Sequence, residues 1–215
     1  MIEAIIFDMD GVLVDTEPVH FMSYQKVLRG HGVEITENQY NNHWIRDGKG
    51  IREFIQERSL DLNANQIRAQ KRKVYQEKLR SGFQIFPGAR EVLESLISEN
   101  YSLALATSSY KEETNLILDL MASKKYFKAI VTCDDVKNVK PSPECFLLAS
   151  QRLEKEPRNT LVIEDAEKGV IAAKNAGMYC IAIRNRLTQN HNLSRANMQL
   201  TTIGQLTPEL ISSFS

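Results

Sequence analysis

The sequence has few cysteines and no long hydrophobic run, and these shortages exclude several classes of protein. Its 215 residues include only Cys133, Cys145 and Cys180, with no CxxC spacing and no nearby histidine cluster. A disulfide framework and a zinc site of the usual spacing are therefore not expected. No apolar stretch approaches the roughly 20 residues that span a bilayer, and the first residues show no secretory pattern. We therefore expect a cytoplasmic protein that does not bind membranes.

The sequence also lacks a surplus of either charge. Its 27 Lys and Arg residues equal its 27 Asp and Glu residues, so no basic field points to nucleic acid as a partner. Locally, residues 49–80 hold nine basic side chains against four acidic ones. This excess is either a solvated helix surface or a surface that attracts an anionic substrate.

Short apolar runs that end in polar residues form the strongest structural pattern. Runs this short and this continuously apolar are typical of parallel strands buried on both faces. The expected strands are residues 4–7, 103–106 and 161–163, with weaker patterns at 129–131 and 180–183. Amphipathic helical patterns alternate with them, at residues 89–99, 113–121, 144–153 and 166–176. This alternation predicts an α/β fold with a doubly wound parallel sheet.

One long interval contains helical patterns alone. Between residues 18 and 83 the apolar spacing predicts helices at 19–28, 51–57 and 64–79, and no good strand. We therefore predict an all-helical domain over residues 18–83. It is inserted into a Rossmann-like core domain made of residues 1–17 and 84–215.

Carboxylates follow two of the expected strands at the point where each strand ends. Asp8 and Asp10 come directly after the first strand, and Gly11 permits a turn that brings them together. Glu164 and Asp165 end another strand. In doubly wound sheets, ligands bind beyond the carboxyl ends of the strands. Close like charges need a compensating cation, and Mg²⁺, which prefers oxygen ligands, is the simplest choice.

Hydroxyl groups and a lysine complete a chemically consistent set. Thr107 and Ser108 follow a third expected strand, and Lys140 lies in a proline-rich loop. Carboxylates, hydroxyls and one lysine suit a phosphoryl group bridged by a metal ion. Hydride transfer is disfavoured because no GxGxxG follows a strand. The chain also lacks the GxSxG elbow of α/β-hydrolases and the Walker A sequence of P-loop nucleotide-binding proteins.

In this order, the residues resemble those of the haloacid dehalogenase superfamily, in particular its branch of β-phosphoglucomutases and sugar-phosphate phosphatases. The resemblance covers essentially the whole chain and rests on four motifs. They are Asp8-Met9-Asp10-Gly11-Val12-Leu13, Ala106-Thr107-Ser108-Ser109, Lys140-Pro141-Ser142-Pro143 and Ile163-Glu164-Asp165.

The resemblance implies a role for each motif. Asp8 would attack phosphorus and form an aspartyl-phosphate, while Asp10 would act first as general acid and then as general base. The second and third motifs would hold the phosphoryl oxygens through Thr107, Ser108 and Lys140.

The resemblance also implies a metal cofactor and a mobile cap domain. Mg²⁺ would bind the Asp8 carboxylate, the Asp10 backbone carbonyl and Asp165, with Glu164 adjacent or directly coordinating. The helical insertion resembles the cap of the family, which closes over the site and excludes water.

Residues of the insertion bear on the choice between phosphatase and mutase. His20 and Lys73 match positions that β-phosphoglucomutase uses. The mutase has a lysine where this chain has Tyr110, and the cap arginine that grips the distal phosphate is represented only by Lys49 or Arg52. A mutase must bind two phosphates. We therefore expect a phosphatase that acts on a small phosphorylated metabolite, a sugar phosphate, with a phosphosugar mutase as the alternative.

Two further alternatives use similar residues. A phospho-acceptor receiver module also combines acidic residues, Thr or Ser and a lysine on a parallel sheet. Its acidic pair and its phosphorylated aspartate lie on different strands, however, and no large helical insertion follows the first strand. A silent relative that only binds metabolites is disfavoured by the four intact motifs. We expect a monomer whose partner is its small substrate.

Overall fold

The computed structural model describes residues 1–186 and 188–214, and within them the chain divides into two compact units. The core unit comprises Met1–Asp15 and Gln84–Ser215, and the helical unit comprises Thr16–Phe83. In the described part of the chain, no helix combines the length and the apolar character that crossing a membrane requires.

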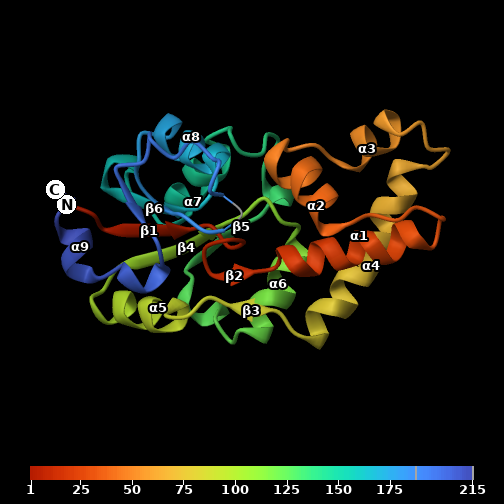
Figure 1. The fold of residues 1–215 in the computed structure, drawn as a ribbon. Helices are drawn as coiled ribbons and strands as arrows, with labels where there is room; N and C mark the ends of the chain where they lie inside the picture. Colours follow the sequence, from red (N-terminus) through yellow and green to blue (C-terminus); the bar gives the residue numbers. More distant parts are fainter. Residues whose placement is uncertain (187, 215) are drawn as a thin grey trace. The chain divides into compact units, whose positions relative to one another are not determined.

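A parallel sheet forms the centre of the core unit (Figure 1). Among the described residues it has six strands in the order β5-β4-β1-β6-β7-β8, and every pairing is parallel. The strands are β1 (Ala4–Phe7), β4 (Ser102–Ala106), β5 (Ala129–Val131), β6 (Thr160–Glu164), β7 (Tyr179–Ile183) and β8 (Met198–Leu200). The predicted α/β fold and its five strands are confirmed, whereas β8 was not predicted. This edge strand reads Met-Gln-Leu, and Gln199 is exposed, so no continuous apolar run marks it.

Helices cover both faces of the sheet, which explains why its central strands β1, β4 and β6 are buried along their whole length. Cys145, Phe146 and Ala149 of α7 (Glu144–Arg152), together with Val170, Ala172 and Ala173 of α8 (Glu167–Asn175), pack against one face. Figure 1 shows α5 (Ala89–Ser98) on the opposite side. The remaining helices of this unit are α6 (Lys111–Leu120), α9 (Pro208–Ser212) and the short 3₁₀ turns η2 (Lys124–Tyr126), η3 (Cys133–Asp135), η4 (Pro157–Asn159) and η5 (Ile203–Gln205).

The order of the strands determines where a ligand can bind. From β1 the chain runs to β4 and β5 on one side of the sheet, and then to β6, β7 and β8 on the other. The direction of winding therefore reverses between β1 and β6. In open α/β sheets, the crevice beyond the carboxyl ends of the strands at such a point is the usual ligand site.

A short antiparallel pair marks the point where the chain leaves and re-enters the core unit. It consists of β2 (Val14–Asp15) and β3 (Gln84–Ile85), with Asp15 opposite Gln84. The 68 residues Thr16–Phe83 lie between these two strands in the sequence.

The helical unit contains α1 (Glu17–Arg29), α2 (Glu37–Tyr40), the π-helix η1 (Asn41–Arg46), α3 (Ile51–Glu57) and α4 (Ala64–Ser81). The predicted helices at 19–28, 51–57 and 64–79 are confirmed. The segment 37–46 was not predicted, because its asparagines have low helix propensity. A reciprocal capping box between Thr36 and Gln39 starts it, and that pattern is readable from the sequence.

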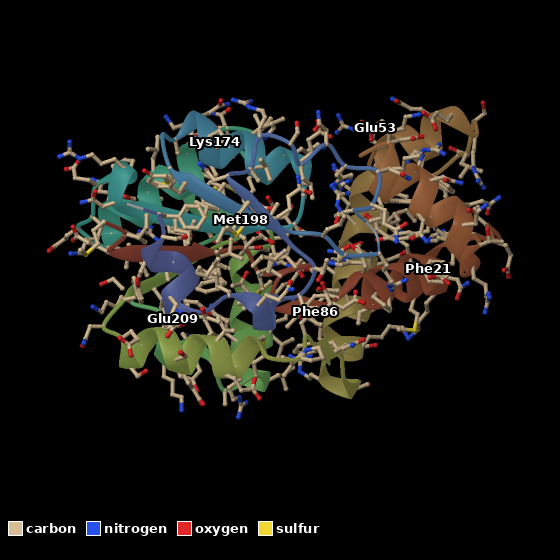
Figure 2. All side chains as sticks on the ribbon, turned by 60° about the vertical axis from the view of Figure 1, so that its left-hand side comes forward. Phe21, Glu53, Phe86, Lys174, Met198 and Glu209 are labelled. Carbon is tan, nitrogen blue, oxygen red and sulfur yellow. The ribbon has the colours of Figure 1, made fainter. Side chains whose placement is uncertain are left out.

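A group of aromatic side chains packs within the largely aliphatic core of the helical unit. The ring of Tyr40, which is buried, stacks on Trp44 with ring centroids 5.1 Å apart. Phe21, which Figure 2 labels on α1, lies 5.5 Å from the Tyr40 ring. Stacked and tilted ring pairs of this kind add to the stabilisation from burial, so the segment 37–46 is held by its aromatic residues.

Candidate active site

Three carboxylates meet at the carboxyl ends of β1 and β6. These strands are paired neighbours, with Phe7 opposite Ile163, so the residues that follow both strands reach the same edge of the sheet. One carboxylate oxygen from each of Asp8, Glu164 and Asp165 lies within 4.8 Å of the others, and all three residues are buried. The carboxylates that follow two of the predicted strands therefore converge at one edge of the sheet.

Lys140 supplies a positive charge to this cluster. Its Nζ donates hydrogen bonds to Asp8 Oδ1 at 2.5 Å, to Glu164 Oε1 at 2.8 Å and to the backbone oxygen of Ala106 at 3.0 Å. The ammonium also lies 4.7 Å from the centre of the buried Phe146 ring, a distance typical of a cation–π contact. The ammonium thus joins the ends of β1, β4 and β6.

Burial, together with the crowding of negative charge, raises the pKa values of two carboxyl groups in this cluster, Asp8 and Asp165. Burial raises the pKa of Asp8 to about 8; Lys140 opposes the shift, and the charges of Glu164 and Asp10 add to it. Burial likewise raises the pKa of Asp165 well above its usual value, aided by the charges of Glu164 and Asp8. Burial would lower the pKa of Lys140, but the charges of Asp8 and Glu164 more than offset it, and this pKa is raised. Such a cluster of buried oxygen donors suits a metal cation.

Glu164 is held from two sides. Its Oε2 accepts hydrogen bonds from the backbone N–H groups of Asp165 and Ala166, at 2.8 and 2.9 Å, while Oε1 accepts from Lys140. The carboxylate also lies against Gly169 on α8, where a Cβ atom would overlap with it. Glu164 therefore fixes Lys140 and the start of the following loop, whatever its role toward a metal ion.

Asp10 lies in a tight turn that follows β1. Gly11 adopts a φ of +83°, as its position in the turn requires, and the N–H of Leu13 donates to the Met9 oxygen at 2.9 Å. Ser109 Oγ donates to Asp10 Oδ2 at 2.8 Å. Ser109 belongs to the second motif, but sequence reasoning did not select it; its place in the hydroxyl run after β4 is the signal that could have found it.

The two hydroxyl residues that were predicted to hold phosphate follow β4, the other neighbour of β1. Thr107 is buried, and its Oγ1 accepts a hydrogen bond from the Ser109 N–H at 3.1 Å. Ser108 is exposed. Their positions at the same edge of the sheet are compatible with phosphate binding, which stays a prediction.

Comparison with known proteins decides the family. Residues 5–183 match the model of the family described as haloacid dehalogenase-like hydrolase. The chain belongs to this family. The resemblance that the four motifs indicated is therefore confirmed, and the protein is an enzyme of the hydrolase type.

The hydrolase has relatives with more specific names. It is 38% identical over 181 residues to a phosphorylated carbohydrates phosphatase of Thermotoga maritima, with 82% of each chain covered. It is 30% identical over 222 residues to a beta-phosphoglucomutase of Bacillus subtilis, covering 97% of this chain and 93% of that one. The crystal structure of CbbY from Rhodobacter sphaeroides in complex with phosphate superposes with a TM-score of 0.86 at 25% identity, covering 96% of both chains. The hydrolase thus shares its sheet and its inserted helical region with this branch of the family.

His20, one of the residues predicted to contact substrate, has a defined environment within the helical unit of the hydrolase. It stacks on Tyr75 with ring centroids 4.1 Å apart, and Lys71 Nζ lies 2.6 Å from its Nδ1. Burial lowers the pKa of His20 well below its usual value, and the charge of Lys71 acts in the same direction. The imidazole is therefore neutral near pH 7, and Nδ1 accepts the hydrogen bond from the lysine.

The two lysines that were predicted to contact substrate differ in their surroundings. Lys49 pairs with Glu57 at 2.7 Å, and its ammonium lies 4.0 Å from an Asp47 oxygen. Lys73 is exposed on α4. Contact of His20, Lys49 or Lys73 with a substrate stays a prediction.

Proposed function

We propose that the hydrolase is a Mg²⁺-dependent phosphatase that acts on a small phosphorylated metabolite, a sugar phosphate, through an aspartyl-phosphate on Asp8. The observation that carries this proposal is the buried cluster of Asp8, Glu164 and Asp165 around Lys140 at the point where the sheet reverses its winding. The relative from Thermotoga maritima, named for phosphorylated carbohydrates, supports the class of substrate.

The donor set fits a hard divalent cation, because all its members are oxygen atoms and their negative charges exceed the charge of Lys140. Asp8, Asp165 and the backbone carbonyl of Asp10 would hold Mg²⁺, with Glu164 adjacent. When bound, the ion supplies positive charge toward the phosphoryl oxygens and allows Asp8 to remain ionised beside the other carboxylates.

The residues of the cluster divide the chemistry between them. A carboxylate oxygen of Asp8 attacks phosphorus, the ester P–O bond breaks, and Asp10 gives its proton to the leaving oxygen. Asp10 then takes a proton from water as the water attacks phosphorus, and the bond between Asp8 and phosphorus breaks. Lys140 directs Asp8, Ser109 holds Asp10 through its 2.8 Å hydrogen bond, and Thr107 and Ser108 bind phosphoryl oxygens.

Two features favour water over a sugar hydroxyl as the acceptor. Tyr110, which replaces the lysine of the mutase, is 47% exposed and provides no positive charge. Lys49, one of the replacements for the arginine that grips the distal phosphate, already pairs with Glu57. The mutase alternative is supported by the relative from Bacillus subtilis and by the matched position of His20. In either case, we assign the helical unit the role of a cap that selects the substrate.

A substrate screen tests this function. Purified protein with Mg²⁺ should release inorganic phosphate from at least one member of a panel of sugar phosphates, and EDTA should abolish the release. The matched assay for the alternative supplies β-glucose 1-phosphate with a catalytic amount of glucose 1,6-bisphosphate. Glucose 6-phosphate formed with little free phosphate would replace the phosphatase by a mutase, and inactivity in both assays would contradict the proposal.

The raised pKa of Asp8 predicts that Mg²⁺ affinity depends on pH. Folding raises this pKa from 3.8 to about 8, so the metal-free folded protein binds a proton that the unfolded chain releases. Its stability therefore falls as pH rises through this window, whereas Mg²⁺ displaces the proton and binds more tightly at higher pH. Between pH 6 and 7 the affinity should rise up to about tenfold for each proton released. Titration calorimetry at both pH values measures it, and an affinity independent of pH would refute this account of the cluster.

A further inference from the structure

Asn185, which no motif singled out, contacts the acidic cluster from the loop after β7. That strand is the neighbour of β6, with Glu164 opposite Ala182, so its loop reaches the same edge of the sheet. Asn185 Nδ2 donates to Asp165 Oδ2 at 2.8 Å and to the backbone oxygen of Gly11 at 3.3 Å. One side-chain amide therefore joins a carboxylate of the cluster to the turn that carries Asp10.

The orientation of this amide is determined by Thr188. The N–H of Thr188 donates to Asn185 Oδ1 at 3.1 Å, and the N–H of Asn185 donates to Thr188 Oγ1 at 3.2 Å. Thr188 is itself buried, with 4% of its surface exposed. Because the amide oxygen is engaged by a backbone donor, the NH₂ group is the side that faces Asp165.

Asp165 is confined on another side by Gly11. A Cβ atom at Gly11 would overlap with the Asp165 carboxylate, so the carboxylate lies directly against the backbone of the turn. The Asn185 amide and the Gly11 backbone together restrict the rotation of this side chain. A carboxylate restricted before an ion binds loses less conformational entropy when it coordinates.

We propose that Asn185 is a positioning residue that pre-orients Asp165 for the cation of the active site. As a neutral donor, Asn185 fixes the carboxylate without adding a positive charge that would repel the ion. A lysine or arginine at this place would form a stronger bond to Asp165 but would compete with the metal. This inference rests on the proposed function, because it assumes that Asp165 is a metal ligand.

Replacement of Asn185 by leucine tests the proposal. Leucine branches at the same atom but cannot donate, and it has room because the residue borders a cavity of about 190 Å³ lined also by Phe86, Ile183 and Thr202 (Phe86 is labelled in Figure 2). Titration calorimetry with MgCl₂ should show a dissociation constant raised about 10- to 100-fold. The Mg²⁺ concentration for half-maximal phosphatase activity should rise by the same factor, while kcat at saturating Mg²⁺ stays within about threefold of the original protein.

Ile183→Val is the matched control, because Ile183 borders the same cavity and its loss of a methyl group removes packing alone. The control should leave the Mg²⁺ dissociation constant within twofold of the original value. If Asn185→Leu does not fold, Asn185→Ala removes the same donor without adding bulk and takes its place. Original Mg²⁺ affinity in the folded variant would overturn the role of Asn185. Absence of saturable Mg²⁺ binding to the unmodified protein would instead overturn the metal requirement of the proposed function, and this inference with it.

Discussion

Replacing Asp8 by asparagine should reduce phosphate release by at least about 10⁴-fold, because the amide cannot form the acyl phosphate that a carboxylate forms. The variant should nevertheless fold. Asp8 is one of three buried carboxylates near Lys140, and Glu164 keeps its own 2.8 Å bond to that lysine. Near pH 7 and without metal, the raised pKa of Asp8 already leaves this carboxyl largely protonated. A neutral amide therefore changes the charge of the cluster little, and we expect the melting temperature without metal to be unchanged.

Phosphate release and melting temperature are measured on the same preparations of Asp8→Asn and of the original protein. Asp119→Asn makes the same chemical change at an exposed position of α6 and should leave both properties unaltered. Retained Mg²⁺-dependent turnover in Asp8→Asn would remove Asp8 as the nucleophile. A strongly lowered melting temperature together with lost activity would show that Asp8 is needed for folding, and the lost turnover would no longer identify the nucleophile.

Replacing Lys140 by alanine should have the largest effect on stability. Its ammonium is buried and bonds to Asp8, Glu164 and the Ala106 carbonyl, so the variant leaves two buried carboxylates without their cation. Breaking a buried ion pair from one side typically costs about 3–5 kcal/mol. We expect a decrease of that order in the free energy of unfolding measured with denaturant in EDTA. Saturating Mg²⁺ should restore part of it, because the ion binds the folded cluster.

Lys137→Ala is the control for this experiment, since Lys137 is an exposed lysine three residues earlier in the same loop. Its removal should change the free energy of unfolding by less than about 0.5 kcal/mol. An equal effect of the two substitutions would mean that Lys140 contributes as an ordinary surface lysine. Normal turnover in Lys140→Ala would also remove it from the assigned chemistry.

The sequence predicts the sheet well because its strands are buried on both faces. Continuous apolar runs such as Ala4–Phe7 and residues 161–163 indicate buried strands strongly when turn residues and amphipathic helices flank them. The pattern fails where burial is one-sided or where tertiary contacts replace propensity. The edge strand β8 and the Asn-rich segment 37–46 are two examples. The capping box marks only the start of the second segment, and its aromatic contacts are not recorded in any local pattern.

The candidate site shows the same difference between what a local sequence pattern indicates and what depends on tertiary contacts. Asp8, Glu164 and Asp165 could be placed together because parallel neighbouring strands bring their carboxyl ends to one edge. The hydroxyl run after β4 could have marked Ser109 as a candidate, but the side-chain contacts of Ser109 and Asn185 could not be predicted, since each depends on the path of a loop and the rotation of one side chain. Ser109 meets Asp10 across 99 residues of sequence, and Asn185 meets Asp165 only because Thr188 turns its amide.

The pairing of Asp15 with Gln84 has a consequence for how such enzymes diversify. The helical unit leaves and rejoins the core unit at two strands hydrogen-bonded to each other, so its ends are as close as the ends of a hairpin loop. Exchanging everything between these residues for the corresponding segment of a relative demands no change in the spacing of the parent scaffold. The segment to which we assign substrate choice can therefore change without altering the core residues for which we propose phosphoryl transfer. Residues 16–83 thus form one contiguous insertion whose two ends meet at the paired strands β2 and β3 of the core unit.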